Sequence, residues 1–365
     1  QDDDESAVEM AAAEAVEVEQ SEPDGEAFPE DVQTSENLYA RGIIDAVVAP
    51  EDIPDILDRA LTCMLPDRAA LSAVEDPADD PVPDVDTWEA VTRSRDPERP
   101  GVRRLLKYAA ADVVPLNGTG QGESDPGLLI ALVRFGDVPC VFLGQDRRGQ
   151  TAAHPLGPEA LREARRGMRL ASELGLPLLT VIDTAGAALS VNAENGGLAG
   201  EIARCLGDLV TLDAPTLSLM LGEGNGGGAL ALLPADRVVA AQHAWLSPLP
   251  PEGASAIVHR DIDHAPEMAR AQRVRALDLA ALGVVDRVVG RPRRAASRHE
   301  LRLGRTQQRG RGRRRRRLPT SRRDQLGGPG AARRAGVRRE QPDRRRSARP
   351  VRVQQRLRRS AAHSR

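Results

Sequence analysis

The stretch LGEGNGGGALALL, residues 221–233, connects an apolar strand to an apolar helical run through five glycines in seven residues. Glycine tolerates positive φ and lets a ligand approach the bare backbone. The first turn of a helix presents N–H groups without intrahelical partners, and the helix dipole favours negative charge there. The stretch therefore predicts a strand, a loop and a helix, with a loop suited to negative charge.

Four interpretations of this loop compete. A Walker loop needs a lysine and then Ser or Thr after its last glycine, but the only lysine in the chain is Lys107. A dinucleotide fingerprint needs an acid about twenty residues further on, and the next acids, Asp236 and Glu252, lie at the wrong distances. The third interpretation is an oxyanion hole made by N–H groups at the helix start. The fourth, tight strand-to-helix packing alone, stays open.

The surrounding sequence predicts alternating strands and helices from residue 100 to residue 290. Two strands within 128–146 are joined by a turn at Gly136 and Asp137, and a helix runs from about Pro158 to Gly175. A strand over 178–182, a helix through 198–209 and a strand over 216–221 follow. This order predicts parallel pairing with right-handed crossovers. Ligands of such sheets bind beyond the carboxyl ends of the strands, where the loops 183–187 and 222–228 lie.

The two ends of the chain differ sharply in charge. Residues 1–36 carry 14 acids and no Lys or Arg, which predicts a disordered acidic segment. Residues 75–99 begin with an acidic, Pro-rich stretch and are expected to be a linker. Residues 291–365 hold 28 Arg against four acids and predict a disordered basic tail. Because its composition changes abruptly near residue 290 and it lacks aromatic residues, a frameshifted reading is favoured over a nucleic-acid-binding arm.

A nine-residue motif occurs twice. ARGIIDAVV at 40–48 and ALGVVDRVV at 281–289 share Ala, Gly, Asp and the two final valines, at an offset of 241 residues. Each motif predicts a strand that ends a unit of similar design, and an amphipathic helix is expected over 50–61. The chain starts at Gln1, and it is expected to be a fragment that lacks nearly all of the first unit.

Several classes of protein are excluded by what the sequence lacks. No apolar run approaches the roughly 18 residues of a membrane helix, and no charged start followed by an apolar stretch suggests a secretory signal, so a cytoplasmic protein is expected. Three cysteines without a CxxC pair exclude a disulfide framework and a four-cysteine zinc site. The segment HRDIDH, 259–264, offers His and Asp side chains, but ligands so close on one segment rarely converge, so no metal is expected.

Four ordered motifs together resemble one enzyme family. They are IDTAGA (182–187), GEGNGGGALAL (222–232), AWLSPLPPEGASAIVHRD (244–261) and ALGVVDRVV (281–289). They resemble the carboxyltransferase of acetyl-CoA or acyl-CoA carboxylase, in particular the α-type, C-terminal half of a fused carboxyltransferase chain. The resemblance spans residues 88–289 and implies an α/β, crotonase-like (ClpP/crotonase) fold built as a spiral of ββα units. It makes 100–290 the α-type domain and 37–74 the end of a truncated β-type unit.

The resemblance also implies a reaction and a site. The carboxyl group of carboxybiotin, held on a carrier protein, passes to an acyl-CoA thioester, giving malonyl-CoA from acetyl-CoA for fatty acid biosynthesis. The N–H groups of Gly228 and Ala229 are expected to form the biotin-side oxyanion hole. Gly186 and Ala187 are expected to line the same cleft, where Ala185 replaces the family's usual proline. The implied substrate-binding residues are Gly186, Ala187, Gly224, Gly226 and Gly227.

The implied partners are a biotin carboxyl carrier protein, biotin carboxylase and the β-type carboxyltransferase half, in a homo- or hetero-oligomer. Arg165, Arg166 and Arg169 lie on one predicted helix, where they either meet CoA phosphates or form a solvated face. Two other functions stay open. One is a biotin-dependent acyl-CoA decarboxylase subunit, and the other is a non-catalytic protein that binds nucleic acid through its basic tail.

Overall fold

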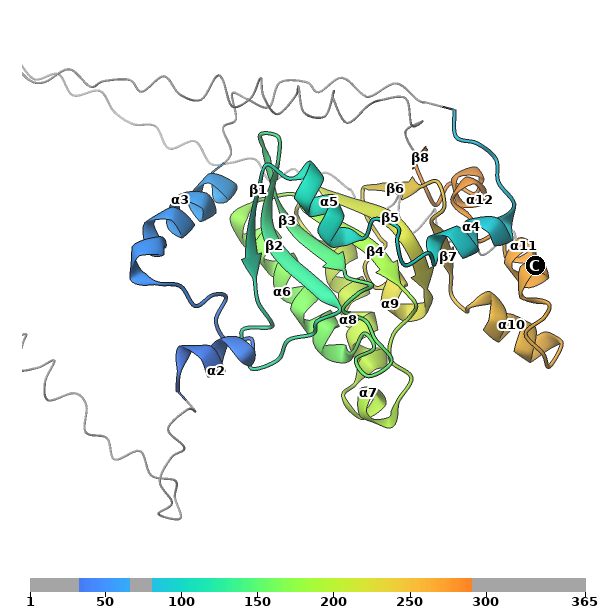
Figure 1. Cartoon of the computed structure of the whole chain (residues 1–365), viewed down its shortest axis with the longest axis horizontal. Helices are drawn as coiled ribbons and strands as arrows, with labels where there is room; N and C mark the ends of the chain where they lie inside the picture. The colour runs from blue at the N-terminus through green and yellow to red at the C-terminus, as the bar shows by residue number, and fades with distance from the viewer. Residues whose placement is uncertain (1–32, 66–80, 291–365) are drawn as a thin grey trace, which may run out of the picture.

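A computed structural model describes residues 33–65 and 81–290 of the chain (Figure 1). In these ranges eight strands form one sheet in the order β1-β2-β3-β4-β5-β6-β8, and β7 pairs with β5. The strands are β1 (Asp112–Leu116), β2 (Leu128–Phe135), β3 (Val138–Gln145), β4 (Leu178–Thr184), β5 (Thr216–Asn225), β6 (Arg237–Ala241), β7 (Trp245–Ser247) and β8 (Arg287–Val289). The pairs β1-β2 and β2-β3 are antiparallel, and every later pair is parallel. The predicted parallel core is therefore confirmed.

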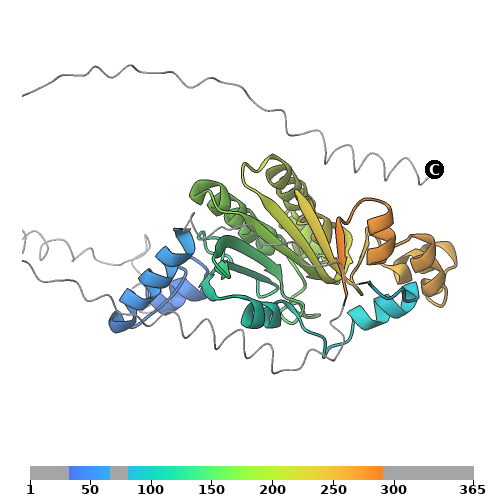
Figure 2. The ribbon, with the colours of Figure 1, turned by 90° about the horizontal axis from the view of Figure 1, so that it is seen from above.

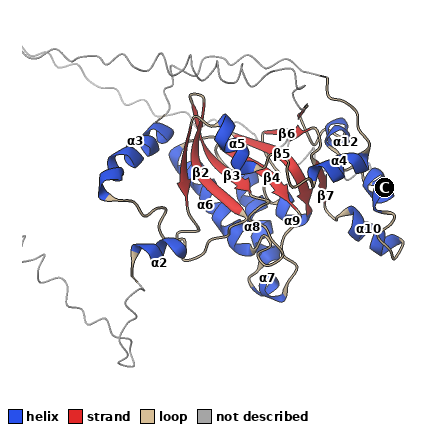
Figure 3. Ribbon diagram, in the orientation of Figure 1, coloured by secondary structure: helices blue, strands red, loops and turns tan. Residues whose placement is uncertain are grey.

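Three helices cover the two faces of the sheet, as Figures 2 and 3 show. α6 (Pro158–Leu174) and α8 (Leu198–Thr211) pack on one face, and α5 (Val102–Ala109) packs on the other. β2 serves both layers because its side chains alternate: Ile130 and Leu132 join the larger core, while Ala131 and Val133 join the smaller one. A strand apolar on both faces is what a covered sheet requires.

The predicted ends of α6 are confirmed. Pro158 stands at the first helical position, where its missing N–H costs no hydrogen bond. Gly175 ends the helix in the left-handed conformation at φ 64°, and its N–H bonds back to Ser172. The turn predicted between β2 and β3 is present as well, with Gly136 at φ +59°.

The predicted linker over 75–99 is wrong for much of its length. Residues 87–94 form the helix α4 (Thr87–Ser94), whose N-cap Asp86 accepts a hydrogen bond from the N–H of Trp88. Val91 and Trp88 pack against Trp245 in a small separate core. The Pro-rich composition concealed a helix because its apolar face is only a few residues wide. Residues 81–86 are irregular, and 75–80 lie outside the described residues.

The strand predicted over 40–48 is also wrong. α2 (Ser35–Ala40) ends there, Gly42 turns the chain at φ +66°, and no strand follows. The second copy behaves alike: α12 (Ala276–Ala281) ends, Gly283 turns at φ +74°, and only the last three motif residues form β8. In both copies the residue after the glycine donates to a carbonyl five residues back, namely Ile43 to Leu38 and Val284 to Leu279.

The remaining helices frame the sheet. η1 (Pro50–Asp52) and α3 (Ile53–Met64) lie at the β1 edge and together cover the helix predicted over 50–61. α4 lies near α10 (Pro251–Val258), α11 (Ala265–Ala271) and α12 at the opposite end of the sheet (Figure 1). The others are α7 (Val191–Asn195) and α9 (Gly226–Leu230). Among the described helices, none has the length and apolar character to span a membrane. Residues 1–32 and 291–365, which hold most of the predicted acidic and basic segments, lie outside the described residues.

Candidate functional site

The glycine loop is the end of a long strand followed at once by a short helix. β5 extends four residues beyond the predicted end at Leu221, because Glu223–Asn225 pair with β7. Gly226 then takes φ +63° and opens α9. Gly226, Gly227 and Gly228 are the first three helical residues, so their N–H groups precede the first intrahelical bond. Gly226 and Gly227 are half-buried, whereas Gly228 and Ala229 are buried.

The DTAGA loop after β4 lies directly beside this helix start. The Asn225 side-chain amide donates to the carbonyl oxygen of Ala185 at 2.7 Å. Gly186 adopts φ +122°, and a Cβ added there would lie 3.4 Å from the same amide nitrogen. The structure therefore brings together the two loops that the sequence placed at neighbouring strand ends. Asn225 was not predicted. It is the N-cap residue of α9, but its side chain bonds to the DTAGA loop and makes no capping hydrogen bond.

Gly228 lies at the closest approach of the two loops. A Cβ on Gly228 would lie 3.1 Å from Cδ2 of Leu156 and 3.2 Å from the amide nitrogen of Ala187. Its carbonyl oxygen accepts a hydrogen bond of 2.7 Å from Nε2 of Gln145. Gln145 is fully buried at the end of β3, and sequence reasoning missed it. The signal that could have found it is its position, because Gln145 is a polar residue at the end of an otherwise apolar, buried strand.

Packing explains two of the other glycines. A Cβ on Gly224 would lie 2.8 Å from the carbonyl oxygen of Trp245, so β7 can pair at this distance only because the side chain is absent. A Cβ on Gly227 would lie 2.6 Å from Cδ1 of Ile202 on α8. The interpretation of the loop as tight packing thus holds for these two positions, whatever else they contact.

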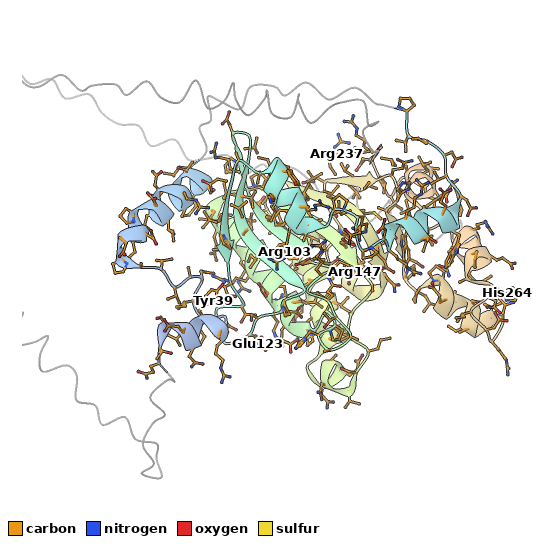
Figure 4. All side chains as sticks on the ribbon, viewed as in Figure 1. Tyr39, Arg103, Glu123, Arg147, Arg237 and His264 are labelled. Atoms are coloured by element: carbon orange, nitrogen blue, oxygen red, sulfur yellow. The ribbon has the colours of Figure 1, made fainter. Side chains whose placement is uncertain are left out.

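A charged network includes Glu223 of the glycine loop and Asp183 of the DTAGA loop. Glu223 is buried and pairs with Arg95 at 3.1 Å and with Arg147. The side chain of Arg147 is labelled in Figure 4. Asp183, the first residue of the DTAGA loop, is fully buried and pairs with Arg99. Oδ1 of Asp183 also accepts the N–H of Glu223 at 3.3 Å. Each buried carboxylate therefore has an arginine partner, which lowers the cost of removing it from water.

The same arginines line a pocket of about 270 Å³ at the carboxyl ends of β3 and β4. Burial raises the pKa of Asp183, and the hydrogen bond and charge of Arg99 oppose that rise. Among the described residues, Oδ2 of Asp183 has no hydrogen-bond partner. Arg95 also forms an ion pair with Glu252, with 2.5 Å between Nη1 and Oε1. Its hydrogen bond lowers the pKa of Glu252. The pocket lining is Ser94, Arg95, Asp96, Pro97, Arg99, Gly101, Asp146, Arg147, Arg148 and Asp183.

Two other predicted features fall outside this site. Arg165 pairs with Asp208 at 2.6 Å and Arg166 with Asp45 at 2.7 Å, so these two arginines tie elements together, while Arg169 is exposed. In HRDIDH, the rings of His259 and His264 stack 4.1 Å apart at the junction of α10 and α11. Across residues 33–65 and 81–290, no group of three His, Cys, Asp or Glu side chains is arranged to hold a metal ion.

Comparison with known proteins places these features in context. Residues 72–313 match the family described as "Acetyl co-enzyme A carboxylase carboxyltransferase-like". The chain is 59% identical over 265 residues to a probable biotin-dependent acyl-coenzyme A carboxylase beta3 subunit of Mycobacterium tuberculosis, covering 73% of this chain and 53% of that protein. It is 35% identical over 270 residues to an acetyl-coenzyme A carboxylase carboxyl transferase subunit alpha of a Methylobacterium species, covering 72% and 81% respectively. The chain thus spans about half of the mycobacterial relative.

Two solved structures share the fold. A transcarboxylase 12S structure superposes with a TM-score of 0.56 at 20% identity, covering 83% of this chain and 60% of that one. A single-chain, multi-domain long-chain acyl-CoA carboxylase gives a TM-score of 0.56 at 19% identity, with 73% and 27% covered. These likenesses confirm the expected α/β, crotonase-like fold.

Proposed function

Because this chain belongs to the acetyl-CoA carboxylase carboxyltransferase family, we propose that it supplies the α-type half of a carboxyltransferase active site. The proposed reaction moves a carboxyl group from carboxybiotin on a carrier protein to a CoA thioester, giving malonyl-CoA when the acceptor is acetyl-CoA. The proposed partners are the carrier protein, biotin carboxylase and a β-type half that completes the site.

One observation carries the proposal: the DTAGA loop and the first turn of α9 meet around Gly228. The N–H groups of a helix start are fixed donors that suit an oxygen gaining negative charge. The proposed hole consists of the N–H group of Gly228, which precedes the first intrahelical bond, and the N–H group of Ala229, which points the same way one residue further into α9. Gly226 and Gly227 form a floor without side chains. Gly186 and Ala187 form the adjoining wall.

The residues present fit a biotin ureido oxygen, which is an acceptor that needs N–H donors and room. When bound, carboxybiotin supplies the carboxyl group that is transferred. The backbone of α9 binds the oxygen, and no side chain of the loop has to move a proton. Glu223 and Asp183 would repel negative charge if unpaired, but both are paired with arginines.

The experiment is a reconstitution of the full chain with a separately expressed β-type half from a related carboxylase and a carboxylated biotin carrier protein. We expect transfer of the carboxyl group to acetyl-CoA or a longer acyl-CoA. Gly228→Val should reduce turnover by at least about two orders of magnitude, because the added side chain enters the proposed hole. An inactive wild-type mixture would contradict the function, and near-wild-type turnover of the variant would contradict the hole.

The same mixture separates carboxylation from its reverse. Release of CO₂ from malonyl-CoA or glutaconyl-CoA, with no net carboxylation of acyl-CoA when ATP, bicarbonate and biotin carboxylase are added, would identify a decarboxylase subunit. Net carboxylation under these conditions supports the proposed direction.

A further inference from the structure

Gln145 links three elements of the proposed site through one buried side-chain amide. Its Nε2 donates to the carbonyl oxygen of Gly228 at 2.7 Å, and its Oε1 accepts the N–H of Asp183 at 3.1 Å. The side chain thus reaches from the end of β3 to the start of the DTAGA loop and to the first turn of α9. A side chain with no exposed surface and both amide ends bonded is fixed in one orientation.

The carbonyl of Gly228 needs this partner because α9 is short. The helix ends at Leu230, and the N–H of Leu232 turns back to Ala229 at 3.2 Å. The carbonyls of the last helical turn lack regular intrahelical partners. A buried carbonyl without a donor would cost a full desolvation penalty, so Gln145 satisfies Gly228 from outside the helix.

The hydrogen bond also fixes a second group. The peptide between Gly228 and Ala229 is trans and planar, so its N–H points opposite to its carbonyl. By holding the oxygen of Gly228, the amide of Gln145 directs the N–H of Ala229 toward the N-terminal end of α9. Donation to the carbonyl also polarises the peptide and makes that N–H a stronger donor.

We propose that Gln145 is a positioning residue, which aims the Gly228–Ala229 peptide of the oxyanion hole and sets its place relative to the DTAGA loop. This inference rests on the proposed function, because it concerns the same hole. Gln145 contacts no substrate in this role and acts through the peptide alone.

The test compares two near-isosteric substitutions in the full chain, Gln145→Met and Thr180→Val. Thr180 is buried in β4 and donates to the carbonyl oxygen of Leu232 at 2.9 Å, so the control loses a buried hydrogen bond close to α9 without touching the Gly228–Ala229 peptide. In the reconstituted assay we expect Gln145→Met to lower kcat at least about tenfold, with little change in KM for the CoA thioester. Thr180→Val should retain most of the wild-type kcat.

A spectroscopic readout is independent of activity. Glycine labelled at its carbonyl carbon and alanine labelled at its nitrogen give signals only from Gly–Ala pairs, and the chain contains four, at 186–187, 228–229, 253–254 and 330–331. We expect Gln145→Met to shift the carbonyl and amide signals of the 228–229 pair. Thr180→Val should leave them near their wild-type positions.

A second variant, Gln145→Glu, keeps the inference testable if the Gln145→Met protein fails to fold. Burial raises the pKa of a carboxyl group, so at this position the protonated acid, which can donate to Gly228, gives way to the carboxylate, which has no hydrogen to donate, as the pH rises. We expect turnover relative to wild type to rise as the pH falls. A wild-type mixture without activity defeats the proposed function. An active wild type with Gln145 variants that keep kcat within about twofold at all pH values, or with unmoved 228–229 signals in Gln145→Met, defeats this inference alone.

Discussion

The guanidinium of Arg99 lies against the backbone of Gly222, in the space that a Cβ would occupy. Arg99 is held there by Asp183, whose carboxylate also lies within 2.7 Å of that Cβ position. The absence of a side chain at Gly222 therefore lets a buried ion pair pass directly behind the glycine loop. This relationship makes Gly222 a structural position rather than a ligand contact.

Gly222→Ala should therefore destabilise the protein by about 2–4 kcal/mol, because the methyl group overlaps two charged side chains that have little room to move. Urea unfolding of the full chain measures the effect. Gly207→Ala is the matched control, since Gly207 lies inside α8 and a Cβ there meets nothing within 4 Å. The control should be stabilised by about 0.5–1 kcal/mol. Equal effects of the two substitutions would contradict the packing described for Arg99.

Glu163 should make stability fall with rising pH. Burial raises its pKa from 4.5 to about 7, and the N–H of Asp125 bonds to its carboxylate. Because the folded pKa lies above the unfolded one, the contribution is fully present below about pH 4.5 and is lost as the pH rises through 7. The difference corresponds to about 3 kcal/mol. We expect Glu163→Gln to gain stability relative to wild type between pH 5 and 8, as measured by urea unfolding at each pH. Parallel curves for the two proteins would show that Glu163 does not titrate in this range.

The sequence predicted best those elements whose signals are local. The β2-β3 hairpin was predicted from two apolar runs on either side of Gly136. α6 was predicted from apolar residues at helical spacing between Pro158 and Gly175. β5 was predicted four residues too short, because Gly222–Asn225 is extended through pairing with β7, which lies twenty residues further along the chain. Long-range pairing of this kind overrides the low strand propensity of glycine.

The candidate site was predicted only in part, because some of its features have local signals and others depend on long-range contacts. Glycine patterns locate loops, so the meeting of the DTAGA loop with α9 could be expected from strand order. The polar support could not, since the side chains of Gln145, Arg99 and Asn225 bond to residues 83, 84 and 40 positions away. Nothing in their own neighbourhoods indicates those partners. The strand predicted over 40–48 failed because a left-handed glycine and a bond back into α2 shape the same residues that read as an apolar strand.

The thiols should be unreactive in the folded protein. Cys63, Cys140 and Cys205 are all buried and free, and burial raises the pKa of Cys140 and of Cys205 to about 12. Because the thiolate is the reactive form, a disulfide reagent at pH 8 should label no cysteine without denaturant and all three after unfolding. Rapid labelling of any thiol in the native protein would show that its surroundings open more readily than the packing indicates.

The two copies of the repeated motif should respond differently to the same substitution. Gly42 and Gly283 both adopt positive φ, but a Cβ on Gly283 meets nothing within 4 Å, whereas one on Gly42 would lie 2.5 Å from the carbonyl oxygen of Glu123. Gly283→Ala therefore carries only backbone strain, about 1 kcal/mol. Gly42→Ala must in addition push the segment around α2 away from the loop that holds Glu123.

Hydrogen exchange shows which segments each of the two substitutions destabilises, as well as by how much. In Gly42→Ala we expect faster exchange confined to residues 38–45 and to the loop 117–123, because the N–H groups of Gly120 and Asn117 bond to Gly42 and Asp45. In Gly283→Ala the exchange of β6 and β8 should stay close to wild type. Similar exchange in the two variants would mean that the first copy of the motif does not depend on its contact with the 117–123 loop.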